Sequence, residues 1–152
     1  MPTPRLAAGA HGRDIPPTAG LPLRWHDLLP GGPADLEARI ASWLGVDALQ
    51  LECSGTSSLV VSLLTLARRS PRKTVVLPAY TCPLVALAVH HCGLRMKLCD
   101  LAPGHFDLDP AALEAACDDD TLAIVVTHLA GRVADTAAAL RCAARCGAAV
   151  IE

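Results

Sequence analysis

The sequence predicts an α/β fold: a mainly parallel sheet with helices on both faces. From about residue 34 onward, helical patterns alternate with short apolar runs, which is the element order of a parallel sheet. The clearest run, residues 122–127, is apolar on both faces, as expected of a strand covered by helices on each side. Hydrophobic residues make up 52% of the 152-residue chain, so a sizeable core can form.

The individual elements follow from periodicity and end signals. A helical stripe begins after Asp35 and ends at Gly45, and its members are Leu36, Ile40, Trp43 and Leu44. We expect the other helices over residues 56–69, 82–92, 110–117 and 136–146. Asp109 and Asp135 should cap the starts of the last two, and Gly147 should stop the last one. We expect strands over residues 49–52, 74–77, 95–99, 122–127 and 148–151.

The ends of the chain differ from its middle. Residues 1–32 are rich in proline and glycine, and we expect an irregular arm with at most a short element around residues 21–29. Residues 33–152 carry the regular pattern and form the domain. The last residues have the character of a central strand, which rarely ends a domain, so we expect the chain to be the front part of a longer protein.

Composition argues against several classes of function. A net charge of −2 gives no basic footprint for nucleic acid, and no apolar run approaches the roughly 18 residues of a membrane span. The first residues lack the apolar core of a secretory signal, which favours a cytoplasmic protein with reduced thiols. The seven cysteines include no CxxC pair, and neither His90-His91-Cys92 nor the Cys142/Cys146 pair has a partner at zinc-finger spacing.

Ligands bind parallel sheets at the carboxyl ends of the strands, so each junction between a strand and a helix is a candidate site. The first junction is Ser54-Gly55-Thr56-Ser57. A helix N-terminus offers unpaired N–H groups to a phosphate, and Gly55 permits close approach. A simple N-cap by Ser54 explains the same residues, and the pattern is neither the GxGxxG nor the lysine-containing phosphate loop.

Two further junctions carry candidate residues. Tyr80, in LPAYTCP, could stack on a planar ligand or pack as an ordinary half-buried aromatic. His128, in THLAG, directly follows a buried strand and should lie near the sheet's carboxyl edge; the alternative is a structural histidine. The fourth junction follows Glu152.

The motifs SGTSSL, VVLPAYTCP, CDLAPGHFDLDPAALEAA, THLAGRVAD and GAAVIE occur in this order. Together they resemble the DegT/StrS-type sugar aminotransferases, which are pyridoxal-phosphate (PLP) enzymes of the aspartate aminotransferase-like fold type I. The resemblance covers about residues 34–152. It implies that the chain is the N-terminal part of the large, PLP-binding domain.

The resemblance also assigns roles to residues. Gly55, Thr56 and Ser57 would bind the cofactor phosphate, and Tyr80 stands at the first aromatic position of the next motif. Cys82 stands where the family places the aromatic residue that stacks on the pyridine ring, which is a departure. His128 begins the H-L-x-G motif, in which Ala130 replaces a residue that is more often aromatic.

Two groups that the family uses are not found in this chain. The family has an aspartate directly after the position of Glu152, which pairs with the pyridinium nitrogen, and a later Schiff-base lysine. The lysines here are Lys73 and Lys97, and neither has that sequence context. The resemblance therefore implies a fragment, inactive alone, of a homodimeric enzyme that moves an amino group, from glutamate, to a keto group of a nucleotide-linked sugar.

Two alternatives remain open at this point. One is a non-catalytic homologue that acts as a binding or regulatory module, which the cysteine at position 82 favours. The other is an unrelated α/β nucleotide-binding domain.

Overall fold

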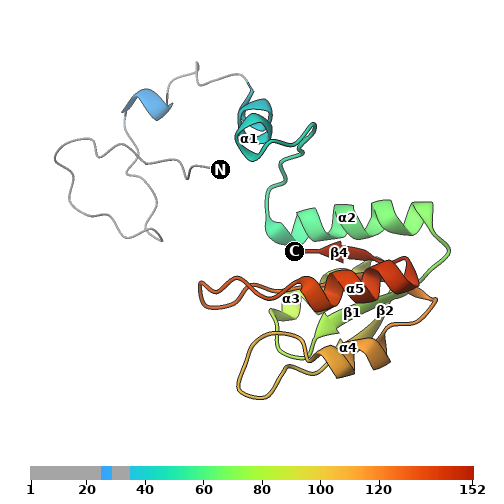
Figure 1. Ribbon diagram of the computed structural model, residues 1–152. Coiled ribbons are helices and arrows are strands. Elements are labelled where there is room, and N and C mark those ends of the chain that lie inside the picture. The colour runs from blue at the N-terminus through green and yellow to red at the C-terminus, as the bar shows by residue number, and fades with distance from the viewer. Residues whose placement is uncertain (1–24, 29–34) are drawn as a thin grey trace. The chain divides into compact units, whose positions relative to one another are not determined.

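The computed structural model describes residues 25–28 and 35–152 (Figure 1). The chain divides into two compact units, residues 1–49 and 50–152. Of the expected N-terminal arm, the described part is the 3-10 helix η2 (Trp25–Leu28), which falls within the short element expected around residues 21–29. The rest of that expectation lies outside the described residues.

Helix α1 (Leu36–Leu44) has the predicted ends. Asp35 Oδ1 accepts a hydrogen bond from the Ala38 amide at 2.9 Å, and Gly45 closes the helix with a left-handed φ of 70°. Its apolar stripe is not a buried face, because Trp43 is 76% exposed and Ala41 is the one buried residue of the helix. The 3.6-residue period predicts the helix correctly but does not say what covers its apolar side.

The second unit is built on four parallel strands in the order β2-β1-β3-β4. The strands are β1 (Thr74–Pro78), β2 (Arg95–Cys99), β3 (Thr121–Val125) and β4 (Ala149–Ile151). The prediction of a strand over residues 49–52 is wrong. Leucine alternates there with the polar residues Gln50 and Glu52, and this alternation predicted a strand. A strand also needs a neighbouring strand to pair with, and these residues pair with none. Leu51 is 43% exposed.

Helices cover both faces of this sheet, which confirms the predicted fold class. Helices α2 (Gly55–Arg69) and α3 (Pro83–His91) pack on one face, where Leu63 and Val89 meet Val75 of β1. Helices α4 (Pro110–Ala116) and α5 (Ala137–Cys146) cover the other (Figure 1). Successive residues of β1 alternate between the two cores, as the pleat requires.

The predicted caps hold with one correction. Asp109 Oδ1 accepts from the Ala112 amide at 2.8 Å, and Gly147 ends α5 with a φ of 70°. The N-cap of α5 is Thr136, not Asp135 as predicted, and Thr136 makes no side-chain cap bond. Asp135 still supplies an acceptor, because its Oδ1 accepts a hydrogen bond from the Ala137 amide at 2.9 Å.

The seven cysteines are free thiols. Cys99 is buried, and burial raises its pKa to about 11; burial raises the pKa of the half-buried Cys117 to about 12. Such thiols behave as small apolar residues. Within residues 25–28 and 35–152, no group of three acidic, histidine or cysteine side chains could hold a metal ion. No helix in the same ranges is long and apolar enough to cross a membrane.

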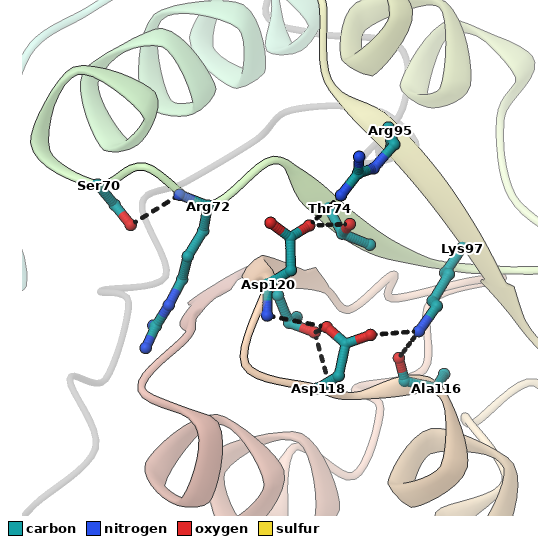
Figure 2. Close-up of polar contacts among 9 residues, drawn as sticks. Ser70, Arg72, Thr74, Arg95, Lys97, Ala116, Asp118 and Asp120 are labelled. Carbon is teal, nitrogen blue, oxygen red and sulfur yellow. Dashed lines mark hydrogen bonds and ion pairs between the residues drawn. The ribbon is translucent and has the colours of Figure 1, made fainter.

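A polar network ties three strands together at the amino edge of the sheet (Figure 2). Asp120, just before β3, accepts from Thr74 Oγ1 of β1 at 2.5 Å and from Arg95 Nη2 of β2 at 2.7 Å. Asp118 accepts from Lys97 Nζ at 2.6 Å. The hydrogen bond from Lys97 lowers the pKa of Asp118, and the bonds from Thr74 and Arg95 lower the pKa of Asp120.

This network predicts that the second unit loses stability in acid. A folded-state pKa below the unfolded value means that the unfolded chain binds more protons, so stability is present above the unfolded aspartate pKa of about 3.9 and is lost as pH falls through the lower folded pKa. Thermal unfolding followed by circular dichroism from neutral pH to about pH 2 should show this decline, and Asp120→Asn should flatten it. The neighbouring Asp119 takes no part in these bonds, so Asp119→Asn is the matched control; an equal effect of both variants would contradict the assignment.

Candidate functional site

A cavity of about 370 Å³ opens at the carboxyl edge of the sheet, between the start of α2, the first turn of α3 and the ends of β3 and β4. The chain's last residue lies beside the start of α2 (Figure 1). Most of the exposed lining is apolar. The polar residues that line the cavity are Ser58, Ser62, Thr127, His128 and Glu152.

The start of α2 shows why its small residues lie together. Ser54 Oγ accepts from the Ser57 amide at 3.1 Å, and the Ser54 carbonyl accepts from the Ser58 amide at 3.0 Å. Ser54 is therefore an N-cap, as one interpretation of the sequence predicts. The Ser57 hydroxyl belongs to the same cap, because it lies 3.0 Å from Ser54 Oγ and 3.2 Å from Cys53 Sγ.

Gly55 leaves room at this helix end. It lines the cavity, and a Cβ placed on it would meet no other atom within 4 Å. The amides of Gly55 and Thr56 belong to the first turn, where helical N–H groups have no acceptor within the helix. Open space in front of such amides suits a phosphate. The N-cap and the phosphate site are thus compatible, and the phosphate site remains a prediction.

The candidate residues of the second junction do not line the cavity. Tyr80 is 64% exposed, and its ring lies 5.9 Å from that of Phe106, centroid to centroid, at 30°. Cys82 is the exposed N-cap of α3, and its thiol makes no cap bond. Neither residue is among those that line the cavity. A hydrogen bond of 3.1 Å between the Thr81 and Thr127 hydroxyls connects this junction with the third one.

His128 joins the third and fourth junctions. Its Nδ1 accepts from the Ala134 amide at 3.0 Å, and its Nε2 lies 3.1 Å from Glu152 Oε2. The structure therefore brings Gly55 and His128 to one cavity, together with Glu152. Thr56 and Ser57 lie at the same helix end, whereas Tyr80 and Cys82 stand outside the cavity.

Sequence reasoning missed Ser62 and Val85 as cavity residues. A signal for Ser62 exists, because Gly55, Ser58 and Ser62 are spaced i, i+3 and i+7 and so share one face of α2. Val85 has no comparable signal, since its place depends on how α3 packs against α2.

Both lysines lie at the opposite edge of the sheet. Lys73 directly precedes β1, and Lys97 donates to Asp118, in the loop before β3, at 2.6 Å. Neither lysine is among the residues that line the cavity at the carboxyl edge.

Ligands of open parallel α/β sheets bind at the carboxyl edge, and a glycine-led helix start at such an edge suits a phosphorylated ligand. The model of the DegT/DnrJ/EryC1/StrS aminotransferase family matches residues 31–152, and the chain belongs to this family. The family's cofactor is pyridoxal phosphate.

Known proteins agree with this assignment. Protein MosB of Rhizobium meliloti is 35% identical over 116 residues, which cover 76% of this chain and 23% of that protein. GDP-perosamine synthase of Caulobacter vibrioides is 33% identical over 118 residues, covering 78% and 32%. The PLP form of Spr1654 from Streptococcus pneumoniae superimposes with a TM-score of 0.64 at 25% identity, over 70% of this chain and 27% of that one.

The chain thus spans between about a quarter and a third of the length of these proteins.

Proposed function

We propose that residues 33–152 form the N-terminal part of the large domain of a PLP-dependent aminotransferase and carry the site for the cofactor's phosphate. The observation that carries the proposal is the open, glycine-led start of α2 at the cavity, in a chain of this family. When bound, the cofactor supplies an electron sink for the carbon that bears the reacting amine.

Different residues would contact different parts of the cofactor. The amides of Gly55 and Thr56 would hold the phosphate, while the side chain of Ser57 is already engaged in the cap. His128 would border the cofactor from the end of β3. The resemblance assigns Tyr80 and Cys82 to the pyridine ring, with Cys82 giving a smaller contact area than an aromatic residue. Because both residues stand outside the cavity, the ring would have to extend beyond it to meet them. The lining of the cavity is largely apolar, which would suit the part of the ring that enters it.

The family suggests which substrates to propose. We propose that the amino group comes from glutamate and goes to a keto group of a nucleotide-linked sugar, in a cytoplasmic homodimer. The name of the relative GDP-perosamine synthase supports a nucleotide-linked sugar. Chemistry also needs a lysine amine at the cofactor aldehyde, and we propose that this lysine and the aspartate that pairs with the ring nitrogen lie outside residues 1–152.

An activity assay tests the proposal that residues 1–152 carry the phosphate site but not the reactive lysine. The 152-residue chain, with added pyridoxal phosphate, glutamate and a nucleotide-linked keto sugar, should show no steady turnover. It should still bind pyridoxal phosphate more tightly than pyridoxal, which lacks the phosphate. Steady turnover would show that Lys73, Lys97 or another group suffices. Equal binding of the two compounds would refute the phosphate site.

A non-catalytic binding or regulatory module is the second candidate, and the exposed thiol at position 82 favours it. The nucleotide sequence directly after codon 152 discriminates between the two. An aspartate codon followed later by a lysine in a loop rich in serine and histidine would support the enzyme. A stop codon with no such gene downstream would support the module.

A further inference from the structure

The polar contacts of His128 use both nitrogens of the imidazole ring. On one side, the backbone N–H of Ala134 points to Nδ1 at 3.0 Å. On the other side, Nε2 lies 3.1 Å from the carboxylate oxygen Oε2 of Glu152. The side chain of His128 is 35% exposed and that of Glu152 is 50% exposed. Both residues line the cavity at the carboxyl edge.

These contacts fix where the ring carries its proton. A backbone N–H can only donate, so Nδ1 must be the unprotonated, accepting nitrogen. A carboxylate can only accept, so Nε2 must carry the hydrogen that faces Glu152. The neutral ring with hydrogen on Nε2 satisfies both contacts at once, and the other tautomer satisfies neither.

A tight turn brings Ala134 back to the ring. The Arg132 amide donates to the Leu129 carbonyl at 2.9 Å, and the two central residues, Ala130 and Gly131, have φ values of 54° and 75°. Two successive positive φ angles define a type I′ turn. Among the described residues, Ala130 is the one non-glycine residue with a positive φ, a conformation that is unfavourable for a residue with a Cβ.

We propose that His128 is a positioning residue. The Ala134 amide holds its ring as the Nε2–H tautomer, and Nε2 then holds the Glu152 carboxylate at the wall of the cavity and orders the end of β4. The ring thereby couples two strand ends that flank the cavity. The inference rests on the proposed function only in taking this cavity as the cofactor's, because the hydrogen bonds themselves exist without a ligand.

Nuclear magnetic resonance of the ¹⁵N-labelled 152-residue chain tests the tautomer directly. At mildly alkaline pH, long-range ¹H–¹⁵N correlation should show His128 with hydrogen on Nε2 alone, while the exposed His90 and His91 exchange between both tautomers. Hydrogen on Nδ1 of His128, or a mixture like that of the exposed histidines, would overturn the proposal. This measurement needs no variant and no cofactor.

Two variants separate positioning from a general role in stability. His128→Gln keeps a donor near the Nε2 position, so the backbone amide of Glu152 should remain ordered while the Ala134 amide exchanges about tenfold faster, as for the loss of about one hydrogen bond. His128→Asn keeps an acceptor near the Nδ1 position, so Ala134 should stay protected while Glu152 becomes disordered. If both variants loosen both amides equally while the amides of β1 and β3 stay protected, His128 is merely structural and the proposal fails.

Adding pyridoxal phosphate to the same sample separates this inference from the proposed function. Binding should shift the amide signals of Gly55 and Thr56. If those signals do not move but His128 shows the Nε2–H tautomer, the cofactor site fails and the positioning role stands. If the signals move but His128 is a mixture of tautomers, the cofactor site stands and the positioning role of His128 fails.

Discussion

Replacing Leu63 by alanine is expected to lower the free energy of unfolding of the second unit by about 2–5 kcal/mol. Leu63 is the fully buried residue of α2, in the cluster that includes Val75, Leu77 and Val89. Its removal takes apolar area out of the core and leaves a cavity that the rigid sheet cannot close. Urea unfolding followed by circular dichroism measures the loss.

The adjacent residue supplies the control for this experiment. Leu64 lies on the same helix but is 39% exposed, so Leu64→Ala removes an equal side chain with much less burial. Its effect should be about 1 kcal/mol or less. Similar losses for the two variants would mean that the sheet face of α2 is assigned wrongly, and with it the orientation that brings Gly55 and Ser62 to the cavity.

Local chemistry explains which parts of the fold can be predicted from sequence. Asp109 and Gly147 mark helix ends through their own backbone and side-chain preferences, and the structure has them as caps. Thr136 replaces Asp135 as N-cap because both positions can supply an acceptor, and local preference does not decide between neighbours. The prediction of a strand over residues 49–52 is wrong for a related reason. Strand formation depends on a partner strand, and the local alternation of apolar and polar residues says nothing about a partner.

The candidate site also has features that can be predicted from sequence and features that cannot. That His128 lies near Gly55 follows from the rule that strand ends of a parallel sheet meet at one edge. The contact between Tyr80 and Phe106 depends on the loop after β2, and no spacing in the sequence signals it. The Ala134 amide reaches His128 through the turn at Ala130 and Gly131, and alanine gives no sign of a positive φ.

Replacing Gly55 by leucine is expected to weaken the binding of pyridoxal phosphate by at least about tenfold without destabilising the fold, since losing one or two charge-assisted hydrogen bonds has that effect. The new side chain would fill the open space in front of the first turn of α2. Gly55 has no positive φ, so leucine is compatible with its backbone and improves the helix propensity by up to about 1 kcal/mol. Binding and stability should therefore change in opposite directions.

Calorimetric titration with pyridoxal phosphate and with pyridoxal isolates the contribution of the phosphate. The variant should lose most of its preference for the phosphorylated compound, because only the phosphate needs the amides at this helix start. Ala111→Leu is the matched control: it places the same side chain in the first turn of α4, on the opposite face of the sheet, and should leave both affinities unchanged. Undiminished preference for the phosphate in Gly55→Leu would remove the start of α2 from the site, leaving Ser54 to Ser57 with the role of a helix cap alone.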